Sequence, residues 1–231
     1  MNKVIYTAIF GNYDSLEKPK FVPDGFDFIC FTDSDIKSDF WKIEKVTPLY
    51  QDSTRNARKY KLLPHRFLPQ YDISIWMDGN FLIINDLNEL LYKYLSDRNF
   101  ACHNHNNCIL DPRDCVYQEA EAILWLGQND PNKKYKDEPS VIKKQIDGYF
   151  NEGYPHNNGL IVSGILVRRH KESNVIETME KWWEEVKYGS KRDQLSFDYA
   201  VWKTGLKYNY IEGDIRDNKY FRLLSHNHQK K

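Results

Sequence analysis

Short apolar runs alternate with amphipathic stretches along almost the whole chain. Helical spacing of apolar side chains occupies residues 52–68, 84–97, 116–127, 173–189 and 192–205. Strand-like runs occupy residues 3–10, 26–33, 72–78 and 159–170, with later strands or extended pieces expected over 208–215 and 220–228. Strands that alternate with helices predict an α/β fold with a mostly parallel central sheet flanked by helices. Because 231 residues without a linker or repeat suit one core, we expect a single domain over residues 1–231.

Polar residues indicate where two of the helices are expected to begin and where one loop is expected. Ser53 or Thr54 is expected to cap the first helix, and Asn85 or Asp86 the second. The most polar stretch of the chain, residues 127–140, is expected to form an exposed loop.

The composition limits the classes of partner. The 33 basic side chains are matched by 33 acidic ones, so bulk charge does not predict a nucleic-acid partner. No run of about 18 apolar residues occurs, which predicts no integral membrane segment. The N-terminus does not resemble a signal peptide, and the four cysteines form no disulfide-type pattern. We therefore expect a cytoplasmic protein with reduced thiols.

Polar side chains follow three of the predicted strands where each strand ends. They occupy residues 11–14, 32–33 and 78–80. In α/β sheets the ligand crevice lies beyond the carboxyl ends of the strands. We therefore expect these three segments to meet at one crevice.

The segment Asp78-Gly79-Asn80 suits a divalent cation. A chain that turns at Gly79 can direct two oxygen-bearing side chains to one ion, and Mn²⁺ and Mg²⁺ prefer oxygen ligands. A simple tight turn is the alternative. Near the C-terminus, His226 and His228 have the spacing that directs both to one face of an extended chain, and an imidazole ligand would favour Mn²⁺. A solvated chain end is the alternative for this pair.

Two further groups of polar residues are candidates for ligand contacts. The first predicted helix carries Arg58 and Lys61 on one broad basic side, which could pair with phosphate or simply face solvent. Asp193 and Gln194 stand at the start of the last predicted helix. They could contact sugar hydroxyls, whereas the alternative for Asp193 is a helix cap.

The segment ACHNHNNCILDPRDC, residues 101–115, is expected to be a polar loop. Its cysteine spacings do not match those of structural zinc sites. His103, His105 and Asp114 still permit an alternative function, that of a metal-dependent hydrolase.

Several segments together carry a family resemblance. In order, VIYTAIFGNYDSL, CFTD, ARKYKLLPHRFLPQYDISIWMDGN, VYQEAEA, SGILVRRHKESN and RDQLSFDYAVW resemble a glycosyltransferase-like family once described as a domain of unknown function. This family includes plant mucilage- and cell-wall-related proteins and bacterial relatives, and it is similar to GT-A glycosyltransferases, especially family 8. The resemblance implies a GT-A-like fold and metal-dependent transfer of a sugar. The donor would be a nucleotide-sugar, with UDP expected, and the acceptor a hydroxyl of a glycan or other molecule.

The resemblance also implies roles for individual residues. Asp78-Gly79-Asn80 takes the place of the Asp-x-Asp motif that binds Mn²⁺ and the diphosphate, with Asn80 removing one negative charge. A late histidine, His226 or His228, would be a further metal ligand. The nucleotide base and ribose would be held by the first strand and its loop, at Ala8, Phe10, Gly11, Tyr13 and Asp33.

The remaining assignments concern the donor sugar. Ser163 and Gly164 fall on the strand that lines this sugar, and Asp193 and Gln194 fall beside the reacting carbon. If the reaction inverts, Asp193 is the first candidate for the base; if it retains, the leaving phosphate can take that role. Because Asn80 weakens the motif, a non-catalytic nucleotide- or sugar-binding module is a further alternative.

Overall fold

A seven-stranded sheet forms the centre of the protein, whose computed structural model describes residues 1–225. The strand order is β3-β2-β1-β4-β7-β6-β8. Only β7 runs antiparallel to its neighbours, so the sheet is mostly parallel, as predicted. The strands are β1 (Lys3–Ile9), β2 (Phe26–Thr32), β3 (Lys42–Lys45), β4 (Ile73–Met77), β6 (Phe100–Asn104), β7 (Ile161–Arg168) and β8 (Asn209–Ile211). A separate antiparallel pair consists of β5 (Phe81–Ile83) and β9 (Phe221–Leu223).

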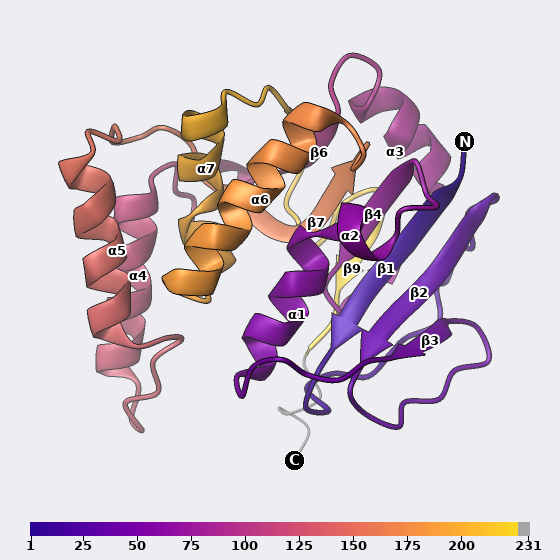
Figure 1. The fold of residues 1–231 in the computed structure, drawn as a ribbon, viewed down its shortest axis with the longest axis horizontal. Helices are drawn as coiled ribbons and strands as arrows, with labels where there is room; N and C mark the ends of the chain where they lie inside the picture. Colours follow the sequence, from indigo (N-terminus) through magenta and orange to yellow (C-terminus); the bar gives the residue numbers. More distant parts are fainter. Residues whose placement is uncertain (226–231) are drawn as a thin grey trace.

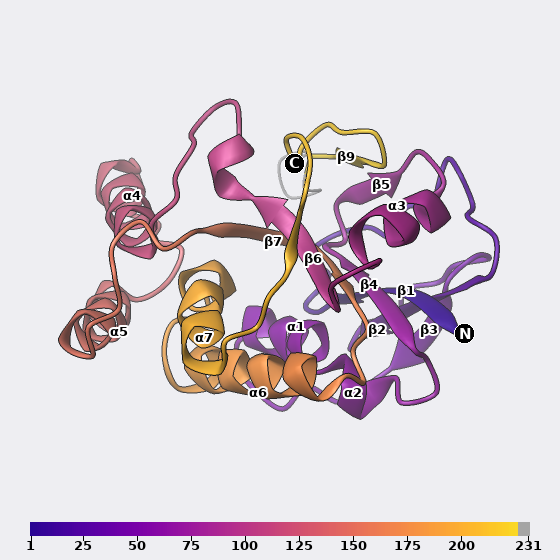
Figure 2. The ribbon, with the colours of Figure 1, turned by 90° about the horizontal axis from the view of Figure 1, so that it is seen from above.

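Helices cover both faces of this sheet, as an α/β fold requires. Figures 1 and 2 show α1, α2, α6 and α7 on one face, and α3 with β5 and β9 on the other. The helices α4 and α5 lie side by side at one end of the molecule (Figure 1). The bounds are α1 (Ser53–Leu62), α2 (Pro64–Phe67), α3 (Leu87–Tyr94), α4 (Val116–Asn129), α5 (Pro139–Asn151), α6 (Ser173–Tyr188) and α7 (Phe197–Thr204).

The central strand β1 shows how the sequence builds two cores. Val4 and Tyr6 belong to the core under α1, α6 and α7, whereas Ile5 and Ile9 belong to the core under α3 and β5. Successive side chains of a strand point to opposite faces, so a strand covered on both sides must be apolar throughout. This is the pattern that the sequence of residues 3–10 predicts.

Two predicted helices are interrupted in the structure. The helix expected over 52–68 is α1 followed by α2, and α2 begins at Pro64. Proline has no N–H to continue a helix and its ring clashes with the preceding turn. The helix expected over 192–205 is a 3₁₀ turn, Asp193–Leu195, followed by α7.

The predicted caps have different outcomes. Asp86 caps α3 by accepting a hydrogen bond from the N–H of Asn88, which is one of the two alternatives predicted. The prediction for α1 was wrong, because the cap is Asp52, whose carboxylate accepts from the N–H of Arg55 at 2.8 Å. An aspartate one residue earlier reaches the same unpaired N–H groups.

The stretch 127–140 is mainly an exposed loop, as expected, but the helix that follows it was not predicted, and a strand occupies the start of the expected loop 101–115. The polar stretch 127–140 leads directly into α5, which buries Ile142 and Tyr149 along one side. These positions, with Ile146 between them, have helical spacing, so the signal was present in the sequence. The first residues of the segment 101–115 belong to β6, where the side chain of His103 is buried beside apolar neighbours.

Two further observations concern the class of protein. Within residues 1–225, no helix has the length and apolar character needed to span a membrane. All four cysteines are free and buried.

Candidate functional site

A cavity of about 290 Å³ opens where the carboxyl ends of β1 and β4 lie side by side. The chain leaves β1 toward β2 on one side of it and returns to β4 on the other side. This is a topological switch point, where open α/β sheets bind their ligands. The wall consists of Ala8, Ile9, Phe10, Tyr13, Asp14, Ser53, Thr54, Ala57, Arg58, Trp76, Asp78, Gly79, Lys136, Lys191 and Arg192.

Asp78 follows β4 directly and projects into this cavity. Its backbone N–H donates to the carbonyl of Gly164, which places the residue at the end of the β4–β7 pair. The indole N–H of Trp76 donates to Asp78 Oδ1 at 2.8 Å. Arg58 Nη1 and Lys61 Nζ approach the same oxygen at 3.6 and 3.5 Å. These three contacts all reach Oδ1 of the Asp78 carboxylate.

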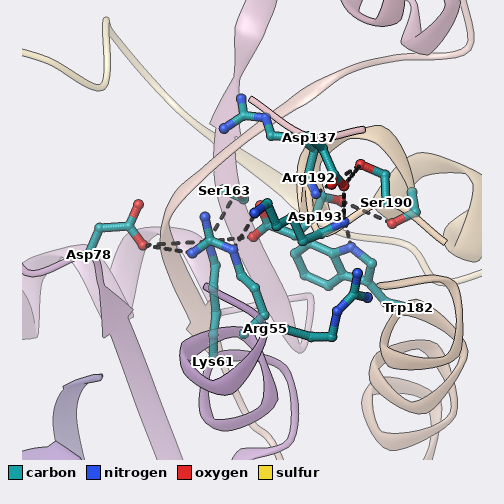
Figure 3. Close-up of polar contacts among 12 residues, drawn as sticks. Arg55, Lys61, Asp78, Asp137, Ser163, Trp182, Ser190, Arg192 and Asp193 are labelled. Carbon is teal, nitrogen blue, oxygen red and sulfur yellow. Dashed lines mark hydrogen bonds and ion pairs between the residues drawn. The ribbon is translucent and has the colours of Figure 1, made fainter. Parts of the chain in front are cut away.

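A buried ion-pair network lies directly behind Asp78. Lys61 is completely buried, and its Nζ lies 2.6 Å from Asp193 Oδ2 and 3.2 Å from Ser163 Oγ. Arg58 Nε lies 3.2 Å from the other oxygen of Asp193. Two cations from α1 therefore face two carboxylates, one from the end of β4 and one from the turn before α7 (Figure 3).

The protonation of this network follows from burial and charge. Burial acts to raise the pKa of Asp193, but Arg58 and Lys61 outweigh it and lower this pKa to about 2. Burial lowers the pKa of Lys61, with Arg58 adding to the effect and Asp193 and Asp78 opposing it. Asp193 is therefore held as a carboxylate by its neighbours.

These contacts correct one interpretation of Asp193. Its side chain makes no capping hydrogen bond, and it lies in a 3₁₀ turn before α7 rather than at the start of a long helix. Its backbone carbonyl accepts from the indole N–H of Trp182 at 2.7 Å, which ties the turn to α6. The structure therefore does not support the alternative of a helix cap. The role of Asp193 as a base stays a prediction, and its contacts indicate that it anchors Arg58 and Lys61.

The structure places the other predicted ligand residues in two groups. Ala8, Phe10, Tyr13, Arg58 and Asp78 line the cavity. Gly11, Asp33, Lys61, Ser163, Gly164, Asp193 and Gln194 lie outside its wall.

Residues outside the wall support the site from behind. Asp33 accepts a hydrogen bond from the N–H of Gly11 at 2.9 Å and so holds the loop after β1. Gly164 is required by packing, because a side chain there would come within 2.9 Å of the Phe81 ring. Gln194 is buried, next to the ion pairs of Asp193. The three strand ends therefore do meet. The residue after β2, Asp33, does not line the cavity but holds the loop that follows β1.

Asn80 lies beside the C-terminal segment of the described chain. Its side-chain amide donates to the backbone carbonyl of Leu224 at 3.2 Å. Its backbone carbonyl accepts from the N–H of Leu224 at 2.8 Å. It lines an adjoining cavity, which shares Asp14 and Gly79 with the first one. His226 and His228, predicted as metal ligands, lie outside the described residues.

The fit of a divalent cation depends on the carboxylates of the wall. Asp78 and Asp14 are the acidic residues there, and Asn80 faces the adjoining cavity. Within residues 1–225, no group of three or more His, Cys, Asp or Glu side chains could hold a metal ion. Of the wall residues, Asp78 and Asp14 could hold such an ion, and phosphate and water are common further ligands of Mg²⁺ and Mn²⁺.

The same observation bears on the hydrolase alternative. His103 is completely buried, and burial lowers its pKa to about 4. His105 lies near Arg113 and Glu119. The Glu119 carboxylate already pairs with Arg113 at 2.7 Å. Asp114 joins them in no group of metal-binding type within residues 1–225. The structure therefore offers no support for a metal-dependent hydrolase at these residues.

Several wall residues were not recognised from the sequence. Lys136 and Lys191 reach the cavity from segments that follow α4 and α6, whereas Asp14, in the loop after β1, belongs to the segment 11–14 that was expected at the crevice. The lysine-rich stretch 132–136 could have indicated a phosphate-binding segment, but a run of lysines in a polar loop usually indicates only a solvated surface. Nothing local connects it to the end of β4.

Comparison with known proteins identifies the family. Residues 30–212 match the family described as "TOD1/MUCI70, glycosyltransferase-like domain". The chain belongs to this family. The resemblance noted in the sequence, to a glycosyltransferase-like family with mucilage-related members, is thereby confirmed.

One curated protein that the chain is similar to is the "Probable hexosyltransferase MUCI70" of Arabidopsis thaliana. It is 28% identical over 237 aligned residues, which cover 90% of this chain. The chain spans only 38% of the length of that relative.

Solved structures of low sequence identity are also similar. The apo structure of the bifunctional glycosyltransferase WbbM matches with a TM-score of 0.48 and 12% identity, over 91% of this chain and 38% of that one. The apo structure of mouse xyloside xylosyltransferase 1 matches with a TM-score of 0.46 and 9% identity, over 91% of this chain and 84% of that one.

Proposed function

We propose that the protein is a glycosyltransferase that moves a hexosyl or related sugar from a nucleotide-sugar to a hydroxyl of a glycan or other acceptor. We further propose UDP as the nucleotide and Mn²⁺ as the metal, with Mg²⁺ as the substitute. The observation that carries this proposal is the cavity at the β1–β4 switch point, which combines Asp78 with four cationic side chains. Membership of a glycosyltransferase-like family supports the reaction class.

The cavity suits a leaving group with several negative charges. Arg58, Lys136, Lys191 and Arg192 surround it, against the carboxylates of Asp14 and Asp78. Departure of a nucleoside diphosphate concentrates charge on its phosphate oxygens, and fixed cations stabilise that charge without reorganising. When bound, a divalent cation at Asp78 would neutralise part of the same charge.

The chain's own residues hold these groups in place. Asp193, which also pairs with Lys61, keeps Arg58 at the wall, and Trp76 orients the Asp78 carboxylate. Ala8, Phe10 and Tyr13 form the part of the wall where a nucleotide base would lie. A group that accepts the proton of the acceptor hydroxyl must reach the cavity, so Asp14, Asp78 or an oxygen of the departing diphosphate fits that role better than buried Asp193 does.

The first test is calorimetric titration of UDP with Mn²⁺ and with EDTA. We expect UDP to bind in both, and Mn²⁺ to tighten binding about tenfold or more. Asp78→Asn should remove this Mn²⁺ effect, because it keeps the acceptor for Trp76 but loses the charge. Turnover would then be followed as release of UDP from a panel of UDP-sugars with glycan acceptors.

The matched control is Asp72→Asn, just before the other end of β4, where the carboxylate pairs with Lys171 at 2.7 Å. It should leave the Mn²⁺ effect intact. Mn²⁺-enhanced UDP binding that survives Asp78→Asn would contradict the metal assignment. Tight UDP binding without any turnover would indicate the non-catalytic module instead.

The cellular location of the protein stays a prediction.

A further inference from the structure

Two loops that are far apart in the sequence are joined beside the cavity. One is residues 130–138, between α4 and α5, and the other is residues 189–192, between α6 and the 3₁₀ turn. Asp137 Oδ2 accepts from Ser190 Oγ at 2.7 Å and from the N–H of Lys191 at 2.8 Å. Gln145 accepts from the N–H of Ser190 at 2.9 Å. Ser190 is completely buried, so the two loops form one packed unit (Figure 3).

This junction brings three cations to one side of the cavity. Lys136 comes from the first loop, and Lys191 and Arg192 come from the second. Lys191 Nζ is held 2.6 Å from Asp52 Oδ2, at the start of α1. Arg192 Nη2 lies 3.7 Å from Glu119 on α4.

Basic side chains outnumber acidic ones in the wall of the cavity. The chain has equal numbers of basic and acidic residues. The side chains that line the cavity include four cations and two carboxylates, and Asp193, Asp52 and Glu119 pair with Arg58, Lys191 and Arg192 from outside the wall. Cationic side chains on a concave wall attract anionic ligands. The start of α1, at Ser53 and Thr54, also lines the cavity, and the backbone N–H groups of a helix start carry a partial positive charge.

We infer that Lys136, Lys191 and Arg192 form a phosphate-binding wall, and that Asp137 is the positioning residue that assembles it. The identification of the ligand as a nucleoside diphosphate rests on the proposed function. This basic wall faces the diphosphate, whereas Asp78 faces any metal ion. Phosphate binding at the basic wall therefore needs neither a metal nor a sugar.

The basic wall is tested with inorganic pyrophosphate in EDTA, by calorimetry on the whole chain. Lys136→Ala and Lys191→Ala should each weaken pyrophosphate binding about tenfold, the effect of one lost charge-assisted hydrogen bond. The matched control is Lys134→Ala, which removes the same charge from the same loop but from a residue outside the cavity wall. It should change the affinity less than about twofold. Equal effects of Lys134→Ala and Lys136→Ala would overturn the assignment, as would wild-type protein that does not bind pyrophosphate.

Asp137 permits a sharper test, because charge and geometry predict opposite results. Asp137→Ala removes a negative charge near the cavity, so Coulomb attraction alone would tighten pyrophosphate binding. If Asp137 assembles the basic wall, binding should instead weaken about fivefold or more, because Lys136 and Lys191 lose their positions. Glu138→Ala removes the same charge from the next residue, whose side chain accepts a hydrogen bond from Ser140 Oγ at 3.5 Å, and should not weaken binding. Pyrophosphate binding by Asp137→Ala that equals or exceeds wild type would overturn the positioning role.

Ser190→Ala provides a second variant if Asp137→Ala fails to fold. It removes the side-chain hydrogen bond to Asp137 and leaves the one from the N–H of Lys191, so a smaller loss of affinity is expected. The outcomes separate the two proposals. Loss of pyrophosphate binding in Lys136→Ala without any sugar transfer by wild type would contradict only the proposed function. Sugar transfer by a wild type whose pyrophosphate affinity is unchanged by Lys136→Ala and Lys191→Ala would contradict only the basic wall.

Discussion

At the scale of single residues, the unusual feature is a lysine with no exposed surface. Lys61 lies at the end of α1 between Asp193, Ser163 and the indole of Trp76, and these partners compensate for its burial. Buried ion pairs contribute little net stability, but breaking one leaves an uncompensated charge in the interior. The network therefore has a structural consequence that can be measured apart from any ligand.

Lys61→Met should lower the free energy of unfolding by about 3 kcal/mol, because Asp193 stays buried with one cation fewer. The double variant Lys61→Met/Asp193→Asn should recover most of this loss. Urea unfolding gives both values. Lys59→Met, on the same helix but partly exposed, is the control and should stay within about 0.5 kcal/mol of wild type. A Lys61→Met protein as stable as wild type would show that the network is not an obligatory ion pair.

Asp198, on α7, has an environment opposite to that of Asp193. Burial raises its pKa to about 7, although Tyr208 and the N–H of Ile161 donate hydrogen bonds to it at 2.9 and 3.1 Å. The unfolded chain releases this proton near the ordinary pKa of 3.8. Between these two values the folded state binds more protons than the unfolded state. The stability from Asp198 is therefore complete below pH 3.8 and is lost as the pH rises to about 7.

Urea unfolding at pH 5 and pH 8 tests this effect of Asp198. Wild type should lose up to about 1.4 kcal/mol of unfolding free energy for each pH unit between 5 and 7. Asp198→Asn has no proton to release there, so its stability should fall less over the same range. Parallel pH profiles for the two proteins would show that Asp198 ionises normally.

At the scale of elements, α1 and α6 are joined by one side chain. Arg55 on α1 donates to the carbonyls of Val186, Lys187 and Gly189 at the C-terminal end of α6. The last carbonyls of a helix have no partner within it, and a cation satisfies both their hydrogen bonds and the helix dipole. This contact also fixes the start of the loop that carries Lys191.

Arg55→Met should therefore lower the free energy of unfolding by about 1.5–3 kcal/mol, the range for hydrogen bonds that involve a charged group. The control is Arg66→Met, which breaks an ion pair between α2 and Glu180 on α6. That guanidinium is half exposed, so its loss should cost about 0–1 kcal/mol. Equal losses in the two variants, measured by urea unfolding, would contradict a capping role for Arg55.

At the scale of the whole molecule, the cavity is assembled from five separate parts of the chain. They are the end of β1, the start of α1, the end of β4, the loop before α5 and the loop after α6. Each part has ordinary local chemistry. The site exists because the parallel strands end at one edge and the helices deliver their loops to that edge.

The sequence by itself determined the layers of the fold and the part of the site that follows the strands. Alternating apolar residues in β1 and helical spacing in α3 and α6 are local consequences of which face is buried, so they can be recognised without knowing the neighbour. Asp78 and Tyr13 were predicted because they follow strands of a mostly parallel sheet. The family motifs, which also span consecutive residues, were recognisable for the same reason.

Only the tertiary structure decided which charged groups meet. For Asp193 the sequence offered a cap, a base or a sugar contact, and it did not indicate the ion pair with Lys61, a residue more than a hundred positions earlier. Lys136 lies in an exposed loop, as expected, but the sequence did not indicate that this loop lines the same cavity as Asp78. An ion pair depends on distance in space and on burial, and neither is encoded in the spacing of nearby residues. Periodicity therefore predicts that a segment has a buried face, while long-range packing alone determines the partner of a charge.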